Sequence, residues 1–349
     1  MRLLENIRLS EDSLSVVILD QTLLPGETKY LVLRDSQELR EAIYMLRVRG
    51  APAIGIFAAY ALYVLARQSA AVGYAAFRAE VMKHSDYLNS ARPTAVNLGT
   101  QLRRMLRLVD SMEGGHVSRV LEAMRLEAIG IHNEDIAMCK AISENGLSIS
   151  ENGVPLFRGG LGIMTVCNAG PIATSRYGTA LGPILLGHER GLPLRVFCCE
   201  TRPLLQGARL TAFELDSSGV DYTLICDNMA SIVMKEGKVG AVFAGCDRIA
   251  RNGDTANKIG TSGLAVLAKY YGIPFYVFGP SSTLDPDCGS GAEIVIEERP
   301  YEEITGLYFN RQIAPADARC YNPSFDVTDG GLITAIITEK GIFRHPYSF

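Results

Sequence analysis

The strongest constraint on the fold is a series of short apolar segments that recurs between residues 162 and 278. Polar or glycine residues follow each segment, and a stretch with helical spacing comes next. Strands that alternate with helices in this way predict a mostly parallel sheet with helices on both faces. Strands that are apolar along their whole length fit a sheet buried on both faces. The predicted strands cover residues 162–166, 194–199, 221–225, 240–244 and 274–278, and the predicted helices cover residues 173–190, 206–217, 229–236 and 261–271.

The N-terminal part of the chain predicts helices instead. Asp35 and Ser36 stand where helix caps are favoured. In the last two predicted helices, apolar residues recur three and four positions apart. Two short alternating stretches around Pro25 and Gly26 predict a small β-hairpin within residues 14–33. The predicted helices cover residues 35–45, 53–68, 75–89, 95–112 and 118–145. We therefore expect an α/β protein with a mainly helical N-terminal domain, residues 1–150, and a domain built on the parallel sheet, residues 151–349.

Composition and charge exclude several classes of protein. The chain has 34 Lys and Arg against 38 Asp and Glu, a formal net charge of −4, and no basic cluster, so we expect no nucleic-acid partner. The longest apolar stretch, residues 51–66, is short for a membrane span and contains Pro52 and Gly55, so we expect no membrane partner. Eight cysteines in 349 residues fit a protein of the reducing cytoplasm better than a disulfide scaffold.

Two candidate catalytic residues follow predicted strands. In open parallel sheets, ligands bind outside the carboxyl ends of the strands. Cys167 follows the first strand, where the amides of a following helix would lower the pKa of its thiol. A cysteine buried for packing is the alternative interpretation. Asp247 follows the strand 240–244, and it is either a helix cap or a catalytic acid.

Residues 251–261 are predicted to form a polar loop, which contains Asn257 and Lys258 just before a predicted helix. Backbone amides at a helix start and a nearby lysine can cradle a phosphate group. The chain lacks both the Walker loop and the G-x-G-x-x-G motif, so no dinucleotide cofactor is expected. No Cys-x-x-Cys pair is present and the five histidines are scattered, so no metal site is expected either. After the strand 194–199, Gln206 can reach a ligand hydroxyl.

Arginines near predicted helix starts indicate an anionic substrate. Arg49, followed by Gly50 and Ala51, precedes one helix, and Arg92 precedes another. A solvated side chain is the default interpretation of either arginine. Together with Lys258, however, they favour a phosphorylated substrate, because the guanidinium group matches the geometry of a phosphate.

Taken together, these segments resemble the methylthioribose-1-phosphate isomerase family. Its superfamily includes ribose-1,5-bisphosphate isomerases and the regulatory subunits of a translation-initiation exchange factor. Seven motifs stand in the family's order: Leu19-Asp-Gln-Thr-Leu-Leu-Pro25, Arg49-Gly-Ala-Pro-Ala-Ile-Gly55, Arg92-Pro-Thr-Ala-Val-Asn97, Cys167-Asn-Ala-Gly170, Glu200-Thr-Arg-Pro203, Gln206-Gly-Ala-Arg-Leu-Thr211, and Asp247-Arg-Ile with Asn252-Gly-Asp-Thr-Ala-Asn-Lys-Ile-Gly-Thr261.

The resemblance implies a Rossmann-like α/β catalytic domain, a homodimer, and an aldose–ketose isomerisation of a C1-phosphorylated pentose without metal or cofactor. It implies that Cys167 is the catalytic thiol and Asp247 the proton donor. An acid that opens the sugar ring needs a raised pKa, which the apolar strand end 240–245 would provide. The residues that the resemblance implies as substrate and phosphate contacts are Arg49, Gly50, Ala51, Arg92, Gln206, Asn257 and Lys258.

One departure from the family pattern bears on the substrate. Many relatives have a histidine where this chain has Val166, next to the proposed thiol. We expect 5-methylthioribose 1-phosphate as substrate, with 5-deoxyribose 1-phosphate as the first alternative and ribose 1,5-bisphosphate as another. A non-catalytic regulatory subunit is the contrasting class, and such a protein would be expected to lack the Cys and Asp pair.

Overall fold

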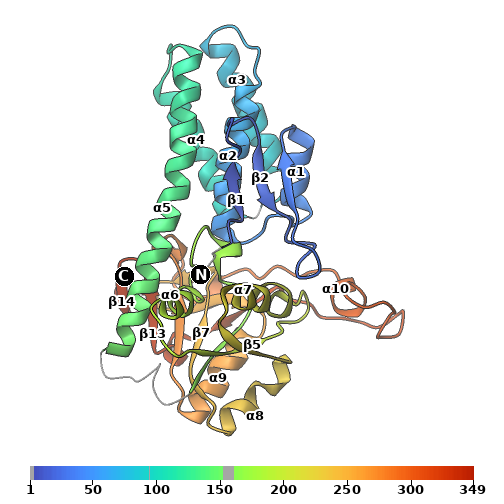
Figure 1. The fold of residues 1–349 in the computed structure, drawn as a ribbon, viewed down its shortest axis with the longest axis vertical. Helices are drawn as coiled ribbons and strands as arrows, with labels where there is room; N and C mark the ends of the chain where they lie inside the picture. The colour runs from blue at the N-terminus through green and yellow to red at the C-terminus, as the bar shows by residue number, and fades with distance from the viewer. Residues whose placement is uncertain (1–3, 94, 152–160) are drawn as a thin grey trace. The chain divides into compact units, whose positions relative to one another are not determined.

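The computed structural model describes residues 4–93, 95–151 and 161–349. These residues form two compact units (Figure 1). The helical unit comprises residues 4–137 and 171–176, and the α/β unit comprises residues 138–151, 161–170 and 177–349. The domain boundary between residues 150 and 151 stays a prediction, and residues 152–160, directly after it, lie outside the described chain.

The helical unit contains a small antiparallel sheet and five helices. Its strands are β1 (Ile7–Leu9), β2 (Val16–Leu19) and β3 (Tyr30–Leu33), paired in that order. The predicted hairpin is therefore present as β2 and β3, and β1 adds a third strand. The helices are α1 (Ser36–Tyr44), α2 (Ala51–Arg67), α3 (Tyr74–Asn89), α4 (Val96–Ser111) and α5 (Val117–Glu151), the last of which continues into the α/β unit.

Local sequence explains where two of these helices form. Asp35 caps α1 because its carboxylate accepts hydrogen bonds from the backbone N–H groups of Gln37 and Glu38, both at 2.9 Å. Helix α2 is apolar on all sides, and every residue from 53 to 66 is buried. A helix of that kind belongs in the centre of a core, and here it packs against α3 and α4.

The α/β unit is built on a seven-stranded sheet that confirms the predicted fold class. The strand order is β14-β13-β10-β7-β4-β5-β6, and all strands except β14 are parallel. The strands are β4 (Gly162–Thr165), β5 (Arg195–Cys199), β6 (Asp221–Ile225), β7 (Val239–Ala244), β10 (Phe275–Phe278), β13 (Ala335–Thr338) and β14 (Gly341–Phe343).

Helices cover both faces of this sheet, as the alternation of buried side chains requires. Ile163 and Phe243 face one core, together with Leu185 of α6 (Gly182–Glu189). Met164 and Val242 face the opposite core. Two further helices contribute to that opposite core, α8 (Ala230–Lys235) and α9 (Thr261–Tyr271), while α7 (Ala212–Ser218) packs on the same side as α6.

Two predicted helices begin differently from the prediction: one starts later in the chain, and the other starts with a π-helical turn. The helix predicted over 173–190 is confined to α6, because Tyr177 and Gly178 adopt positive φ angles of 64° and 88° that interrupt a helix. A Cβ at Gly178 would overlap the backbone of Ala169 and Gly170, so the chain approaches closely there. The helix predicted over 206–217 begins with a π-helical turn, Gly207–Thr211, that leads into α7.

A second sheet occupies the stretch that we predicted to be a polar loop, which is a correction. Residues 251–261 include the whole of strand β9, which belongs to a sheet with the strand order β11-β8-β9-β12. The four strands are β8 (Arg248–Ala250), β9 (Thr255–Lys258), β11 (Leu284–Asp285) and β12 (Phe325–Thr328). The sequence of β9 is too polar to show strand periodicity. It pairs with the nearby β8 on one edge and with β12, which is distant in the chain, on the other.

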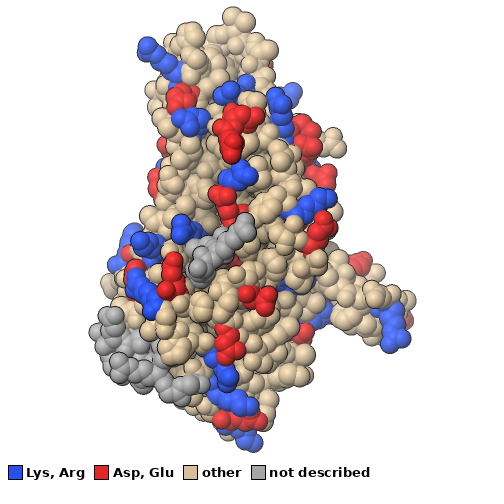
Figure 2. All heavy atoms as spheres, viewed as in Figure 1, with Lys and Arg blue, Asp and Glu red and all other residues tan. Residues whose placement is uncertain are grey.

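The described surface carries mixed charge. On the face seen in Figure 2, Lys and Arg are interspersed with Asp and Glu among the described residues. Within the described part of the chain, no helix combines the length and the apolar character that crossing a membrane would require. A short helix, α10 (Glu302–Thr305), lies in the segment before β12.

Candidate active site

The order of the strands places a switch point beside β4. From β4 the chain runs outward to β5 and β6, and it then returns to β7 on the other side of β4. In open α/β sheets, ligands bind at such a point, outside the carboxyl ends of the strands. Cys167 follows β4 and Asp247 follows β7, so the two predicted catalytic residues stand at the ends of neighbouring strands on the two sides of the switch point.

Cys167 is half-buried and occupies a left-handed turn, with φ of 63°. Its N–H donates to Oγ1 of Thr201 at 2.8 Å, and its carbonyl accepts from Oγ1 of Thr211 at 2.6 Å. We predicted that a helix N-terminus directly after this residue would lower the thiol pKa. That expectation is wrong in its geometry, because α6 begins only at Gly182.

Thr201 and Asp227 hold the loop after β5, and neither was among the predicted site residues. Thr201 is buried and also has a positive φ, of 64°. The Asp227 carboxylate accepts the N–H of Thr201 at 2.8 Å and the N–H of Arg202 at 2.7 Å. The signal in the sequence was Thr201 itself, which lies within the Glu200-Thr-Arg-Pro203 motif, but nothing local indicates that its hydroxyl binds Cys167.

Gln206 is buried directly beside the end of β5. A Cβ at Gly207 would overlap the carbonyl oxygen of Cys199, so the π-helical turn packs against that strand without space between them. Oε1 of Gln206 has no hydrogen-bond partner among the described residues. A buried acceptor of this kind fits a ligand hydroxyl as its donor, since buried polar atoms in proteins are nearly always paired.

Asp247 is exposed, which differs from the apolar enclosure expected of it. Its backbone N–H donates to the carbonyl of Ala256 on β9 at 2.9 Å, and this bond ties the end of β7 to the second sheet. Its neighbour Cys246 is more buried than Asp247, and the Cys246 thiol lies 3.4 Å from Oγ1 of Thr283. Burial raises the pKa of Cys246 to about 12, so this thiol stays protonated at neutral pH.

Asn257 and Lys258 both lie on β9 and are buried. Nδ2 of Asn257 donates to Oγ1 of Thr261 at 3.0 Å. Nζ of Lys258 donates to the carbonyl of Ser324 at 2.8 Å and lies 4.6 Å from the centre of the Phe325 ring. The hydrogen bond of Nζ is therefore made to a neutral carbonyl group and not to a carboxylate.

The start of α9 is not the phosphate cradle that the sequence suggested, which is a correction. Asp326 accepts the N–H of Gly260 at 2.7 Å and the N–H of Ser262 at 3.0 Å. These amides are therefore already paired with a carboxylate. Burial raises the pKa of Asp326, although the amide donors oppose that shift.

Four predicted contacts, Arg49, Gly50, Ala51 and Arg92, belong to the helical unit, whereas Cys167, Gln206, Asp247, Asn257 and Lys258 belong to the α/β unit. A Cβ at Gly50, whose φ is 96°, would overlap the backbone of Ala173. The segment 171–176, which follows the cysteine motif, is therefore packed against Gly50. Thr94, part of the Arg92 motif, lies outside the described residues.

Asn6 holds the same segment within the helical unit. Its Nδ2 lies within hydrogen-bond distance of three carbonyl oxygens, those of Pro171 at 3.0 Å, Ile172 at 2.9 Å and Thr174 at 2.8 Å. Gln21 donates to the same Ile172 carbonyl at 3.0 Å. Both polar side chains are buried. The chain just after the cysteine motif is thus fixed by side chains that precede it by more than 150 residues.

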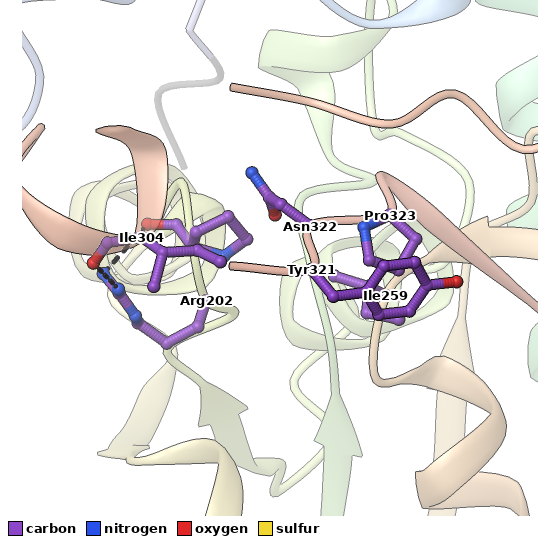
Figure 3. A pocket seen from close by; sticks show the side chains of 7 residues that line it. Arg202, Ile259, Ile304, Tyr321, Asn322 and Pro323 are labelled. Carbon is purple, nitrogen blue, oxygen red and sulfur yellow. Dashed lines mark hydrogen bonds between the residues drawn. The ribbon is translucent and has the colours of Figure 1, made fainter. Parts of the chain in front are cut away.

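Two cavities open near the loop after β5. The smaller cavity, of about 260 Å³, is lined by Arg202, Pro203, Ile259, Ile304, Tyr321, Asn322 and Pro323 (Figure 3). The guanidinium group of Arg202 donates to the Ile304 carbonyl at 2.6 Å. The larger cavity, of about 550 Å³ and mostly apolar, is lined by Val166, Cys199, Arg202, Asp227, Ile259, Gly260, Gly263, Leu264, Val266 and Leu267. Cys167 and Asp247 line neither of these two cavities. Among the described residues, no group of three His, Cys, Asp or Glu side chains could hold a metal ion.

Comparison with known proteins identifies the family. Residues 47–345 match the Initiation factor 2 subunit family. A methylthioribose-1-phosphate isomerase of Parabacteroides distasonis is 55% identical over 97% of this chain and 98% of its own length. A 5-deoxyribose 1-phosphate isomerase of Petrotoga mobilis is 54% identical over 98% of this chain and 96% of its own.

Solved structures agree with these relatives. The 5-methylthioribose 1-phosphate isomerase of Pyrococcus horikoshii superposes with a TM-score of 0.93 at 38% identity, covering 99% of this chain and 94% of the other. A translation initiation factor eIF-2B, subunit delta, from A. fulgidus gives 0.89 at 40% identity, covering 99% and 97%. The chain therefore belongs to the Initiation factor 2 subunit family and, within it, to the methylthioribose-1-phosphate isomerases whose motifs it carries.

Proposed function

We propose that this protein converts 5-methylthioribose 1-phosphate to the corresponding 1-phosphoribulose. The chain is an aldose–ketose isomerase, as are its relatives that carry that activity in their names. One observation carries the assignment of the site: Cys167 and Asp247 follow neighbouring parallel strands at the switch point, where α/β sheets bind ligands.

The chemistry assigns a different task to each of these two residues. A phosphate on C1 locks the sugar as a cyclic acetal, so the ring must open before the carbonyl group can move. In our proposal, bound substrate covers the carboxyl group of Asp247, which is exposed in the structure, and this desolvated group donates a proton to the ring oxygen as the bond from that oxygen to C1 breaks. Hydrogen then moves from C2 to C1 and the C2 hydroxyl becomes the carbonyl, with the Cys167 thiol acting at C2 as base or beside the developing charge.

The remaining predicted residues would bind the substrate. The buried charge of Lys258 and the side chain of Asn257 would attract the phosphate, and Arg49 and Arg92 would add guanidinium donors that match it. The unpartnered Oε1 of Gln206 would accept a hydrogen bond from a sugar hydroxyl. Gly50 and Ala51 would contribute backbone N–H groups. These roles are proposals, supported by the motif positions and by the burial described above.

A second substrate, 5-deoxyribose 1-phosphate, is favoured by a specific observation. The relative from Petrotoga mobilis that carries this name is nearly as similar as the one named for the methylthio sugar. The two sugars differ by one small apolar group, which a pocket distinguishes by about 1–3 kcal/mol. We therefore expect turnover of both, with a higher kcat/KM for the methylthio sugar. Ribose 1,5-bisphosphate, which needs a second anion site, is the third substrate to assay.

The deciding experiment compares kcat/KM for the three sugar phosphates with purified wild-type protein. Cys167→Ser and Asp247→Asn serve as controls for the site, and each is expected to lose most of the activity. Activity on none of the substrates would contradict the isomerase assignment and favour a non-catalytic regulatory subunit. Full activity of both variants would contradict the roles given to these two residues.

Three further parts of the proposal concern the protein as a whole. We propose that it acts as a homodimer in the cytoplasm and that it needs no metal or cofactor. Light scattering after gel filtration checks the dimer, which should have twice the 37.9 kDa mass of one chain. Dialysis against a chelator should leave the activity unchanged. The hydrogen can move from C2 to C1 as a proton or as a hydride. With deuterium at C2 of the substrate, deuterium retained at C1 without exchange with water would count against simple proton abstraction.

A further inference from the structure

Glu214 is a buried carboxylate that the reaction scheme leaves without a task. It stands in the first turn of α7 and is only 1% exposed. Nδ2 of Asn168, the residue after the proposed catalytic thiol, donates to Oε2 of Glu214. A Cβ at Gly170 would overlap the same carboxylate, so the chain that follows Cys167 lies directly against Glu214. Carboxylates are almost never fully buried without such partners.

A chain of hydrogen bonds links this carboxylate to Cys167. Nδ2 of Asn168 also lies 3.2 Å from Oγ1 of Thr211, and that hydroxyl donates to the Cys167 carbonyl at 2.6 Å. Thr211 is fully buried. The side chains of Glu214 and Thr211 therefore hold both Asn168 and the carbonyl group of Cys167 from the same helical segment.

The backbone at Cys167 needs support of this kind. Its φ of 63° lies in the left-handed region, which residues with a Cβ occupy only where the surroundings determine the conformation. On the amide side, Thr201 supplies one hydrogen bond. On the carbonyl side, the support comes from Thr211 and, through Asn168, from Glu214.

We propose that Glu214 is a positioning residue for Cys167: it fixes Asn168, which together with Thr211 keeps the left-handed turn and so aims the thiol at the reacting carbon. The inference rests on the catalytic role proposed for Cys167. An acceptor oxygen of the right size at position 214 is what the turn requires. Glutamine provides one and leucine does not.

The test compares Glu214→Gln and Glu214→Leu in the full chain with 5-methylthioribose 1-phosphate. Glu214→Leu should lower kcat about 100-fold, the loss expected when a reacting group is misplaced by about 1 Å. KM should change far less, because the groups proposed to bind the phosphate are elsewhere. Glu214→Gln should retain most of the wild-type kcat. A matched control is Glu339→Leu, since Glu339 accepts the N–H of Ser281 at 2.8 Å at another loop of the same unit, and this variant should keep the wild-type kcat.

A second readout follows the thiol itself. The rate at which iodoacetamide alkylates Cys167, measured by mass spectrometry of its peptide, should change in Glu214→Leu and remain at the wild-type value in Glu214→Gln. If Glu214→Leu does not fold, Thr211→Val and Thr211→Ser take its place, because only serine keeps the hydroxyl that holds the Cys167 carbonyl.

The outcomes separate this inference from the proposed function. If Glu214→Leu keeps the kcat and the alkylation rate of the wild-type protein, the positioning role is overturned. An equal loss of kcat in Glu214→Gln and Glu214→Leu would overturn it as well. Failure of the proposed function would be seen earlier, as a wild-type protein that turns over none of the sugar phosphates. A wild-type protein that is active, with a Cys167→Ser variant of equal activity, would overturn the inference and leave the isomerase activity standing.

Discussion

Thr201 joins the ends of two neighbouring strands through one hydroxyl group. Its Oγ1 accepts the N–H of Cys167 at 2.8 Å and donates to the carbonyl of Cys199 at 3.0 Å. Its own N–H is bound to Asp227. Because Thr201 and Cys167 both have positive φ angles, two locally unfavourable conformations support each other through this contact. At the scale of single residues, the site is therefore determined by hydroxyl and carboxylate groups that hold backbone, in addition to the groups proposed to react.

Replacing Thr201 by valine should destabilise the protein and reduce activity. Valine has the same shape but leaves the Cys167 N–H without its acceptor, and an unpaired buried donor costs about 1–3 kcal/mol. Thr201→Ser keeps the hydroxyl and should stay close to wild type in the free energy of unfolding and in kcat. Urea unfolding and steady-state kinetics check both. Equal stability of the two variants would show that this hydrogen bond contributes little.

At the scale of elements, buried polar contacts join helices of the helical unit. His132 of α5 lies with Nδ1 2.9 Å from the hydroxyl of Tyr60 on α2, and the two rings meet edge to face. Burial lowers the pKa of His132 below its ordinary value of 6.5. The contact between the two helices therefore depends on an imidazole that the fold keeps neutral.

This histidine should make the protein less stable in mild acid. The unfolded chain binds a proton as the pH falls through 6.5, whereas the folded chain resists protonation until the pH reaches the lowered pKa of His132. The free energy of unfolding should fall as the pH is lowered through 6.5 towards the lowered pKa of His132, and less so in His132→Gln. Urea unfolding at several pH values measures the slope. His116→Gln, at an exposed position, is the control and should keep the wild-type slope.

At the scale of the whole molecule, the two compact units have separate hydrophobic cores. Phe57 of α2 is fully buried in the core of the helical unit, and Phe243 of β7 is fully buried in one core of the α/β unit. Multidomain chains often unfold in more than one step. The two phenylalanines offer a matched pair with which to measure how independently the two cores are stable.

Phe57→Ala should loosen the helical unit first. Removing a buried phenylalanine costs about 3–5 kcal/mol. Amide hydrogen exchange should therefore accelerate in α2 and α4 more than in β4 and β7, and Phe243→Ala should reverse this pattern. Hydrogen exchange followed by mass spectrometry distinguishes the segments. Equal acceleration in both units with either variant would show that the chain unfolds as one cooperative body.

The parts of this protein that local sequence determined are those with strong local signals. Five strands of the seven-stranded sheet, β4, β5, β6, β7 and β10, and the helices of the N-terminal part were predictable, because apolar spacing reports directly which faces are buried. Residues such as Cys167 and Asp247 could be placed at strand ends for the same reason. Seven motifs in one order also sufficed to indicate the family, which the relatives confirm.

Tertiary structure alone decided the rest, because those features depend on residues far apart in the chain. The polar strand β9 pairs along one edge with the distant β12, whose Asp326 also accepts the N–H groups of Gly260 and Ser262 at the start of α9. Nothing near Cys167 in the sequence indicates that Thr201, 34 residues later, holds its amide, or that Asp247 is exposed. A sequence reports the periodicity of burial along one segment, whereas hydrogen bonds between segments follow from how the packed elements bring their ends together.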